Sequence, residues 1–179
     1  VALAAWAMLA NKATVLFTFY APLQATPAFY IGAVFLVIST WCTLANQVLT
    51  LRQWRKDGHE GERIPLLAYV SIVTEIMWFL ASIGIAIEVL VFVLPWSLGI
   101  TDSIDPQFTR VLFWFTGHPI VYFWLLPVYV SWYLFLPEQA GKGPVASDGL
   151  VRVVFLAFLM LLPVGIHHQF TDPGIPFSS

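Results

Sequence analysis

The sequence predicts an all-α integral membrane protein, a bundle of transmembrane helices. Of its 179 residues, 59% are apolar and only 10% are charged, whereas an ordinary soluble domain is about 45–50% apolar and about 25% charged. Charged side chains are therefore too few to cover a globule of this size. The net charge of −2 leaves no basic footprint for nucleic acid, and the single cysteine, Cys42, excludes an internal disulfide framework.

Five continuous apolar stretches are long enough to cross a membrane, which takes about 20 helical residues. They cover residues 1–20, 28–51, 66–95, 107–136 and 149–170. Prolines stand at their edges, where proline starts or ends helices: Pro27, Pro65, Pro106 and Pro137. Transmembrane strands would instead be alternating segments of about ten residues. Because the first stretch begins without Met and is already apolar, we expect a single membrane domain, 1–179, cut from a longer polypeptide.

The basic residues between these stretches predict an orientation. Two regions, 52–64 and 137–152, hold most of them: Arg52, Arg55, Lys56, Arg63, Lys142 and Arg152. The opposite side has one basic residue, Arg110, and three aspartates. Because basic loops stay in the cytoplasm, residues 52–64 and 137–148 are expected inside, and residues 21–27, 96–106 and 171–179 outside.

Three of the four histidines fall inside the predicted spans. His118 lies about 12 Å below the outer end of its span, and His167 and His168 lie near the outer end of the last one. Neutral imidazoles suit copper, zinc or iron, and three of them leave an open coordination position. Each histidine could instead hydrogen-bond a neighbouring helix, but three at matching depth favour a metal site. Adjacent residues of a regular helix point about 100° apart, so we expect a distortion near Pro163.

A stripe of tyrosines follows His118 along the same helix. Tyr122 lies one turn deeper, and Tyr129 and Tyr133 return to within about 20° of its direction. Hydroxyl groups along such a stripe can relay protons with intervening water. The alternative is that Tyr129 and Tyr133 belong to the aromatic belt at the membrane interface, which suits Tyr133 well.

Two stretches resemble a known family. Residues 114–127 read WFTGHPIVYFWLLP, and residues 163–174 read PVGIHHQFTDPG. They resemble the sixth and seventh helices of subunit I of the haem–copper oxygen reductases. A His-Pro-x-Val-Tyr motif followed some 45 residues later by His-His is a highly specific pair. The resemblance covers essentially the whole chain, as the end of helix three through helix seven of a subunit with twelve or more helices.

This resemblance implies roles for the polar residues of the two motifs. His118, His167 and His168 would bind the copper of a binuclear haem–copper centre. Tyr122 would be covalently linked to His118 and supply an electron and a proton when the O–O bond breaks. A-type enzymes have glutamate where this chain has Ile120, so the sequence is similar to the B-type enzymes with their single proton path. By that similarity Tyr129, Tyr133 and Ser39 belong to the path.

The resemblance also implies the wider function. The whole enzyme would be a cytochrome c oxidase of a bacterial or archaeal cytoplasmic membrane, reducing O₂ to water and pumping protons. Electrons from cytochrome c would arrive through a copper centre in subunit II. The high-spin and low-spin haems would be ligated outside this segment, which has no spare intramembrane histidine. Two alternatives stay open: a nitric oxide reductase-like subunit with non-haem iron, and a non-enzymatic metal or proton transporter.

Other charged residues lie within the predicted spans or close to their ends. Arg110 and Asp172 mark the outer ends of the two histidine-bearing spans, where we expect an ion pair or a neighbourhood of haem propionates. The alternative is that both groups are unpaired and solvated. Glu88 is expected close enough to the outer end to reach water. Glu75 is deeper, and Lys12 is a possible partner for it. The sequence assigns no role in the mechanism to Glu75, Glu88 or Lys12.

Overall fold

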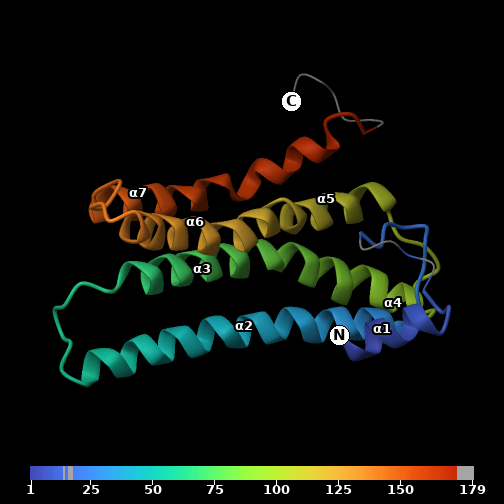
Figure 1. Cartoon of the computed structure of the whole chain (residues 1–179). Helices are drawn as coiled ribbons and strands as arrows, with labels where there is room; N and C mark the ends of the chain where they lie inside the picture. Colours follow the sequence, from blue (N-terminus) through green and yellow to red (C-terminus); the bar gives the residue numbers. More distant parts are fainter. Residues whose placement is uncertain (14, 16–17, 173–179) are drawn as a thin grey trace.

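The computed structural model describes residues 1–13, 15 and 18–172, and the regular elements of this part are all helical (Figure 1). The all-α membrane prediction is confirmed. In the described residues, four segments are long and apolar enough to cross a membrane: Pro27–Lys56, Leu66–Ser97, Pro106–Gln139 and Asp148–Gln169. Their bounds lie close to those of the last four expected spans.

The helices have the following bounds. The regular ones are α1 (Ala2–Leu9), α2 (Pro27–Lys56), α3 (Leu66–Ile87), α4 (Leu94–Ser97), α5 (Pro106–Gly117), α6 (Pro119–Gln139) and α7 (Asp148–Ala157). Two further segments have other windings: η1 (Glu88–Val93) is a π-helix and η2 (Phe158–Gln169) is a 3₁₀-helix. The second, third and fourth spans are therefore each built from more than one helical piece.

The expectation of a single spanning helix over residues 1–20 is wrong, because α1 ends at Leu9. Asn11 adopts a left-handed conformation, with φ of 55°, which asparagine tolerates better than most residues. The Asn11 and Lys12 N–H groups then donate to the carbonyls of Met8 and Ala7, at 3.1 and 2.8 Å. This Schellman motif ends the helix, and the polar pair Asn11 and Lys12 marks its place in the otherwise apolar stretch.

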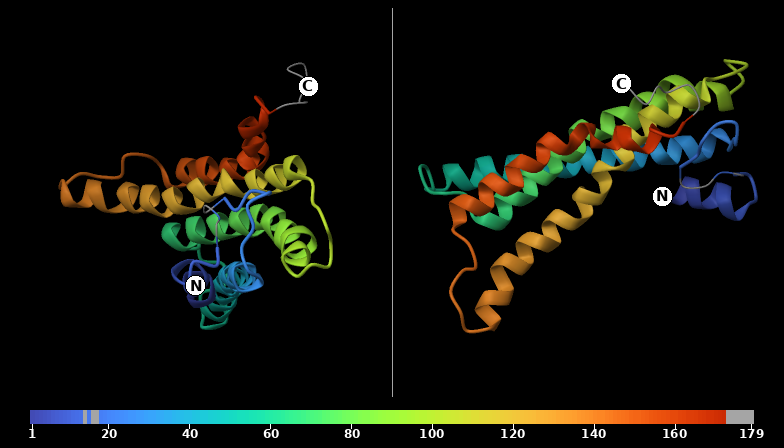
Figure 2. Two further views of the ribbon diagram at one scale, coloured as in Figure 1. Left: turned by 90° about the vertical axis from the view of Figure 1, so that its right-hand side faces the viewer. Right: turned by 90° about the horizontal axis from the view of Figure 1, so that it is seen from above.

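The spans lie side by side, with α3 between α2 and α6 (Figure 1). Two clusters of buried side chains hold them together. One, which includes Phe29, Tyr30, Val93 and Phe113, lies where α2, η1 and α5 meet. The other, which includes Met77 and Leu126, joins α3, α6 and α7. Figure 2 shows α6 leaning away from the bundle towards its C-terminal end.

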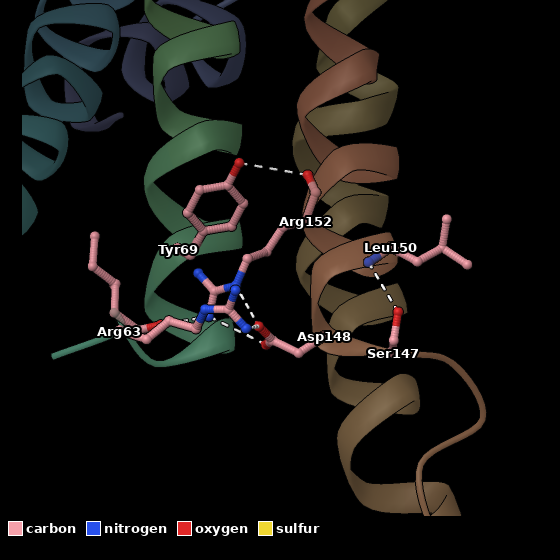
Figure 3. A network of polar contacts seen from close by, with 7 residues as sticks. Arg63, Tyr69, Ser147, Asp148, Leu150 and Arg152 are labelled. Carbon is pink, nitrogen blue, oxygen red and sulfur yellow. Dashed lines mark hydrogen bonds and ion pairs between the residues drawn. The ribbon is translucent and has the colours of Figure 1, made fainter.

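A polar network ties the start of α7 to the start of α3 (Figure 3). Arg152 Nε lies 2.7 Å from Asp148 Oδ2, and Arg63 Nη1 lies 2.9 Å from the same oxygen. Arg152 also donates to the Ile64 carbonyl at 2.5 Å and lies 4.7 Å above the Tyr69 ring. Bidentate and stacked contacts of this kind are specific to arginine. The network sets the position of α7, and through it that of η2.

Candidate metal centre

His118 lies at the joint between α5 and α6. It is both the C-cap residue of α5 and the N-cap residue of α6, and Pro119 is the first residue of α6. Proline has no N–H to donate and is favoured at the first position of a helix. The His118 N–H still reaches the Trp114 carbonyl, at 3.4 Å. The break thus lies beside the histidine and leaves the span otherwise continuous.

His167 and His168 lie on η2. This segment contains Pro163, which cannot donate a backbone hydrogen bond, and is wound as a 3₁₀-helix with about three residues per turn. Gly165 lets η2 approach α5. A Cβ atom there would collide with the Trp114 carbonyl oxygen and lie 3.3 Å from His118 Cβ. The distortion expected from Pro163 is therefore accompanied by a close approach that only glycine permits.

The three imidazoles converge from these two elements. His118 Nδ1 lies 3.2 Å from His168 Nε2, and one nitrogen from each of His118, His167 and His168 lies within 4.8 Å of the others. His167 Nδ1 contacts the Val164 carbonyl, so that Nε2 is the ring nitrogen available to a metal. A histidine ligand commonly donates its other ring N–H to a backbone carbonyl in this way.

Tyr122 completes the cluster from the next turn of α6. Its hydroxyl lies 2.9 Å from His118 Nε2, so both nitrogens of His118 have a neighbour, His168 on one side and Tyr122 on the other. The two rings cross at 70° with their centres 5.2 Å apart. The hydroxyl is placed to exchange a proton with the imidazole, or to be held by it.

Trp114 packs against the histidine cluster. Its indole stacks on the His168 ring, with centres 3.7 Å apart and planes 12° from parallel, and its Nε1–H donates to the Tyr20 hydroxyl. The sequence analysis gave Trp114 and Gly165 no role at the site. The available signal for Trp114 was its position four residues before His118, on the same helical face.

The comparisons with known proteins agree with this geometry. The family described as "Cytochrome C and Quinol oxidase polypeptide I" matches residues 1–178. The chain belongs to this family. Cytochrome c oxidase subunit 1 of Thermus thermophilus is 52% identical over 173 residues, which are 96% of this chain and 30% of that protein. Quinol oxidase subunit 1 of Sulfolobus acidocaldarius is 25% identical over 114 residues, 64% of this chain and 22% of its own.

A solved structure of a haem–copper terminal oxidase dimer matches with a TM-score of 0.92 and 46% identity, over 99% of this chain and 31% of that one. The resemblance read from the two histidine motifs is therefore confirmed at the level of the family. The chain is a multi-pass membrane segment of an oxidase subunit I. It spans about a third of the length of the Thermus protein and of the chain in the solved structure.

Arg110 and Asp172 meet at the outer ends of α5 and η2 in this subunit I segment. Arg110 Nη2 lies 3.0 Å from Asp172 Oδ1, and the guanidinium also lies 4.7 Å above the Tyr20 ring. Through Tyr20 and Trp114 this ion pair is connected to His168. The structure thus joins the two charged residues with each other and with the histidine cluster.

The tyrosines beyond Tyr122 are less closely connected. The Tyr129 ring packs against Trp132, with centres 5.7 Å apart, and the Tyr133 ring packs against Phe155 at 6.3 Å. Ser39 is exposed on α2 and donates to the Leu36 carbonyl of its own helix, at 2.6 Å. Since α3 lies between α2 and α6, the structure does not bring Ser39 to the tyrosines.

Two acidic residues of the Leu66–Ser97 span are buried. Glu88 is fully buried, so the expectation that it reaches water is wrong: α2 and α5 pack against its segment, η1. Glu75 is 8% exposed. Lys12 lies in the turn after α1, exposed and 5.3 Å from the Trp6 ring. Lys12 is therefore not seen as a partner of Glu75.

Proposed function

We propose that this chain is part of the catalytic subunit of a B-type terminal oxidase, which reduces O₂ to water with electrons from cytochrome c. In this proposal His118, His167 and His168 hold copper, and Tyr122 is the linked tyrosine of the haem–copper centre. The observation that carries it is the convergence of three imidazoles from two broken helices, with the Tyr122 hydroxyl 2.9 Å from His118 Nε2.

The donor set fits copper. Two nitrogen ligands at about 2.0 Å from a tetrahedral metal are about 3.3 Å apart, and the His118 and His168 nitrogens are 3.2 Å apart. The Nε2 of His167 requires only a small movement to join them. Imidazole ligands with no nearby thiolate suit copper. When bound, copper and the high-spin haem supply the electron transfers and the O₂-binding position.

Tyr122 supplies the proton and the electron at this centre. Its Oη lies 2.9 Å from His118 Nε2, which brings the two rings together. The covalent link would join Nε2 to a carbon of the phenol ring, with loss of the N–H and C–H hydrogens in a two-electron oxidation for which the substrate O₂ is the oxidant, and the hydroxyl would stay intact. Before this link forms, with His118 Nδ1 turned towards the metal, its Nε2–H would donate to Tyr122 Oη, which orients the phenol and leaves the phenol proton available beside the position where oxygen would bind. Trp114, stacked on His168, fixes the plane of the second imidazole.

Protons for the reaction would rise along α6 from the cytoplasmic side, from Tyr133 through Tyr129 to Tyr122. Because Ile120 stands where A-type enzymes have glutamate, this single path would carry both consumed and pumped protons. Ser39 has little support as a member of this path, because it is exposed on α2 and donates to a carbonyl of its own helix.

The rest of the active site would come from outside this chain. Axial ligands of both haems would come from other helices of subunit I, and electrons would arrive from a subunit II carrying its own copper centre. The ion pair of Arg110 and Asp172 would lie near the haem propionates. The setting would be a bacterial or archaeal cytoplasmic membrane.

Metal analysis and carbon monoxide difference spectra of the intact, reduced oxidase test this proposal. The expected result is one copper per complex in the three-histidine site and a haem that binds carbon monoxide. Non-haem iron in place of that copper would instead indicate a nitric oxide reductase-like site. The absence of a CO-reactive haem would reject the oxidase and leave a metal or proton transporter.

A further inference from the structure

Glu88 is a buried carboxyl group that the proposed function does not use. Its side chain has no exposed surface, and neither carboxyl oxygen has a hydrogen-bond partner among the described residues. Ionisable side chains buried in a membrane protein are costly and are functional candidates by default. An unpaired carboxylate would cost far more than a carboxylic acid in such a place. The neutral, protonated form is therefore the resting form.

The rest of the subunit cannot supply the missing partner without a movement of the side chain. Both Glu88 oxygens are covered by atoms of this chain, so that a water-sized probe cannot reach them. A donor atom from another helix approaches an oxygen about as closely as a water does. Glu88 is thus a dry carboxylic acid in this conformation, whatever covers the outside of the bundle.

Glu88 lies on the outer side of the histidine cluster. Thr116 Oγ1 accepts a hydrogen bond from the Ile85 N–H at 2.9 Å, which sets α3 and α5 at the same level there. Glu88 is three residues further out than Ile85, and His118 is two residues further in than Thr116. At 1.5 Å per residue, Glu88 is about 7 Å further out than His118 and about 13 Å below the end of its span at Ser97.

The winding of η1 puts Glu88 at this position. Glu88 is the first residue of the π-helix that interrupts the span, and π-turns inside α-helices occur frequently at functional sites. Thr116 stabilises the irregularity from α5, because its hydroxyl accepts from the Ile85 N–H and donates to the Ala81 carbonyl at 2.6 Å. The hydrogen bonds of Thr116 therefore stabilise the backbone just before η1.

Ionisable groups from the surrounding elements face Glu88. Tyr30 of α2, also fully buried, accepts from the Ala25 N–H at 3.1 Å, and its own hydroxyl proton has no acceptor among the described residues. Tyr30 and Val89, the residue next to Glu88, belong to the same buried cluster, and Tyr20 packs against it. Tyr20 in turn contacts Arg110 of α5, which pairs with Asp172. These groups lead from Glu88 towards the outer surface.

We propose that Glu88 is a proton-holding site on the outer side of the metal centre, in contact with the outer aqueous phase through the Tyr30 and Tyr20 region. In each cycle the carboxylic acid releases one proton outward and becomes a carboxylate, then takes up one proton from the side of the metal centre. No electron or bond other than O–H is exchanged at Glu88. The ionised form is short-lived because it is unpaired. This inference rests on the proposed oxidase function.

The test uses the intact oxidase complex, reconstituted in vesicles, with Glu88→Gln, Glu88→Asp and Glu88→Leu. Glu75→Gln is the matched control, since Glu75 is a buried carboxyl group of the same span on the cytoplasmic side. Three quantities are measured: O₂ consumption, protons released per electron, and the infrared band of protonated carboxyl groups in redox difference spectra. Carbon monoxide binding checks that each variant has assembled.

In Glu88→Gln we expect O₂ consumption within about twofold of the parent, while the protons released per electron fall by about half or more. The carboxyl band of the parent disappears, and Glu88→Asp restores part of both signals. Glu75→Gln leaves the protons released per electron and the carboxyl band unchanged. Glu88→Leu, which removes the buried polar group altogether, assembles and pumps as poorly as Glu88→Gln.

An unchanged ratio of protons to electrons in Glu88→Gln or Glu88→Leu would overturn the inference. Loss of the protonated-carboxyl band in the redox difference spectrum of Glu75→Gln would also overturn it, because the band would then belong to Glu75. This measurement does not depend on the folding of a Glu88 variant. A parent complex that consumes O₂ without pumping protons would overturn the role of Glu88 and leave O₂ reduction standing. A parent complex without copper or CO-reactive haem would instead reject the proposed function itself.

Discussion

The half of the bundle that holds the histidines and the half that holds Tyr129 and Tyr133 position their polar groups in different ways; we expect the first on the outer side of the membrane and the second on the cytoplasmic side. In the outer half, His118, His168 and Tyr122 are already within 3.2 Å of a neighbour in the cluster. In the cytoplasmic half, Tyr129 and Tyr133 lie on one regular helix and pack against aromatic rings instead of each other. A metal centre needs side chains in contact, whereas a proton path needs only hydroxyl groups that water can bridge.

Helix irregularities account for the difference. The π-helix η1, the break at His118 and the 3₁₀-helix η2 all lie in the three spans that form the outer site. Each irregularity turns a polar side chain inward or lets two backbones approach. The cytoplasmic half is built from regular helices, a shared apolar cluster and the ionic network around Asp148. The contacts of the cytoplasmic half hold the helices in position, whereas the proposed chemistry takes place in the outer half.

The largest difference between the halves is expected from Tyr122→Phe, which removes one hydroxyl at the centre. O₂ reduction should fall by about 100-fold or more, as for loss of a direct proton donor, while copper is retained because the three imidazoles remain. Turnover and copper content of the intact complex check this. Turnover close to that of the parent would show that Tyr122 is not the reacting tyrosine.

Gly165→Ala should disrupt the outer half alone. The added Cβ would collide with the Trp114 carbonyl, and relieving that overlap costs about 1–3 kcal/mol. We expect η2 to move away from α5 and copper occupancy to fall by about tenfold at limiting copper, which corresponds to about 1.4 kcal/mol.

Gly149→Ala in α7 is the matched control for this change, because a Cβ there meets nothing within 4 Å. It should leave copper occupancy as it is in the parent. Equal occupancy in the Gly165 and Gly149 variants would refute the account of the close approach.

The tyrosines of the cytoplasmic half should have a smaller effect. Tyr129→Phe and Tyr133→Phe should slow proton uptake by about tenfold, less than the loss of a direct acid–base group, because water can partly replace a hydroxyl group. Ser39→Ala should leave uptake unchanged, since Ser39 is exposed on α2. Time-resolved uptake with a pH-sensitive dye distinguishes them, and a defect in Ser39→Ala alone would move the path to α2.

The smallest effect is expected from Arg152→Gln in the polar network. It removes the ion pair with Asp148 and weakens the contact with the Ile64 carbonyl, so the complex should lose about 1–2 kcal/mol of stability with turnover preserved. Thermal unfolding followed by haem absorbance measures the change. Arg52→Gln, an exposed arginine of the same side, is the control. A larger loss of turnover than of stability would give the network a role in the chemistry.

Much of the fold followed from the sequence because hydropathy and proline positions report directly on membrane helices. Residues 28–51 and 66–95 were found this way, and the structure extends each by a few residues. The error at residues 1–20 arose because the Schellman motif at Asn11 depends on one backbone conformation inside an apolar run. Hydropathy averaged over the whole stretch does not detect this change of backbone direction, although the polar pair Asn11 and Lys12 marks it.

The three histidines that converge in the structure could be picked out from the sequence, but their geometry could not. The motifs around His118 and His167 name the candidate ligands, and whether adjacent histidines can share one metal depends on the winding of η2. The burial of Glu88 was missed for a similar reason: its distance along the helix suggested access to water, while the packing of α2 and α5 against η1 decides it.

The most direct test of the central claim is the copper content of the intact complex in the parent and in the His167→Ala/His168→Ala double variant. The difference between them excludes copper held by any other subunit. The account predicts that the double variant loses one copper per complex while its haem content is unchanged, because we propose that the haem ligands lie on helices outside this chain. Unchanged copper, or a loss of non-haem iron in its place, would contradict it.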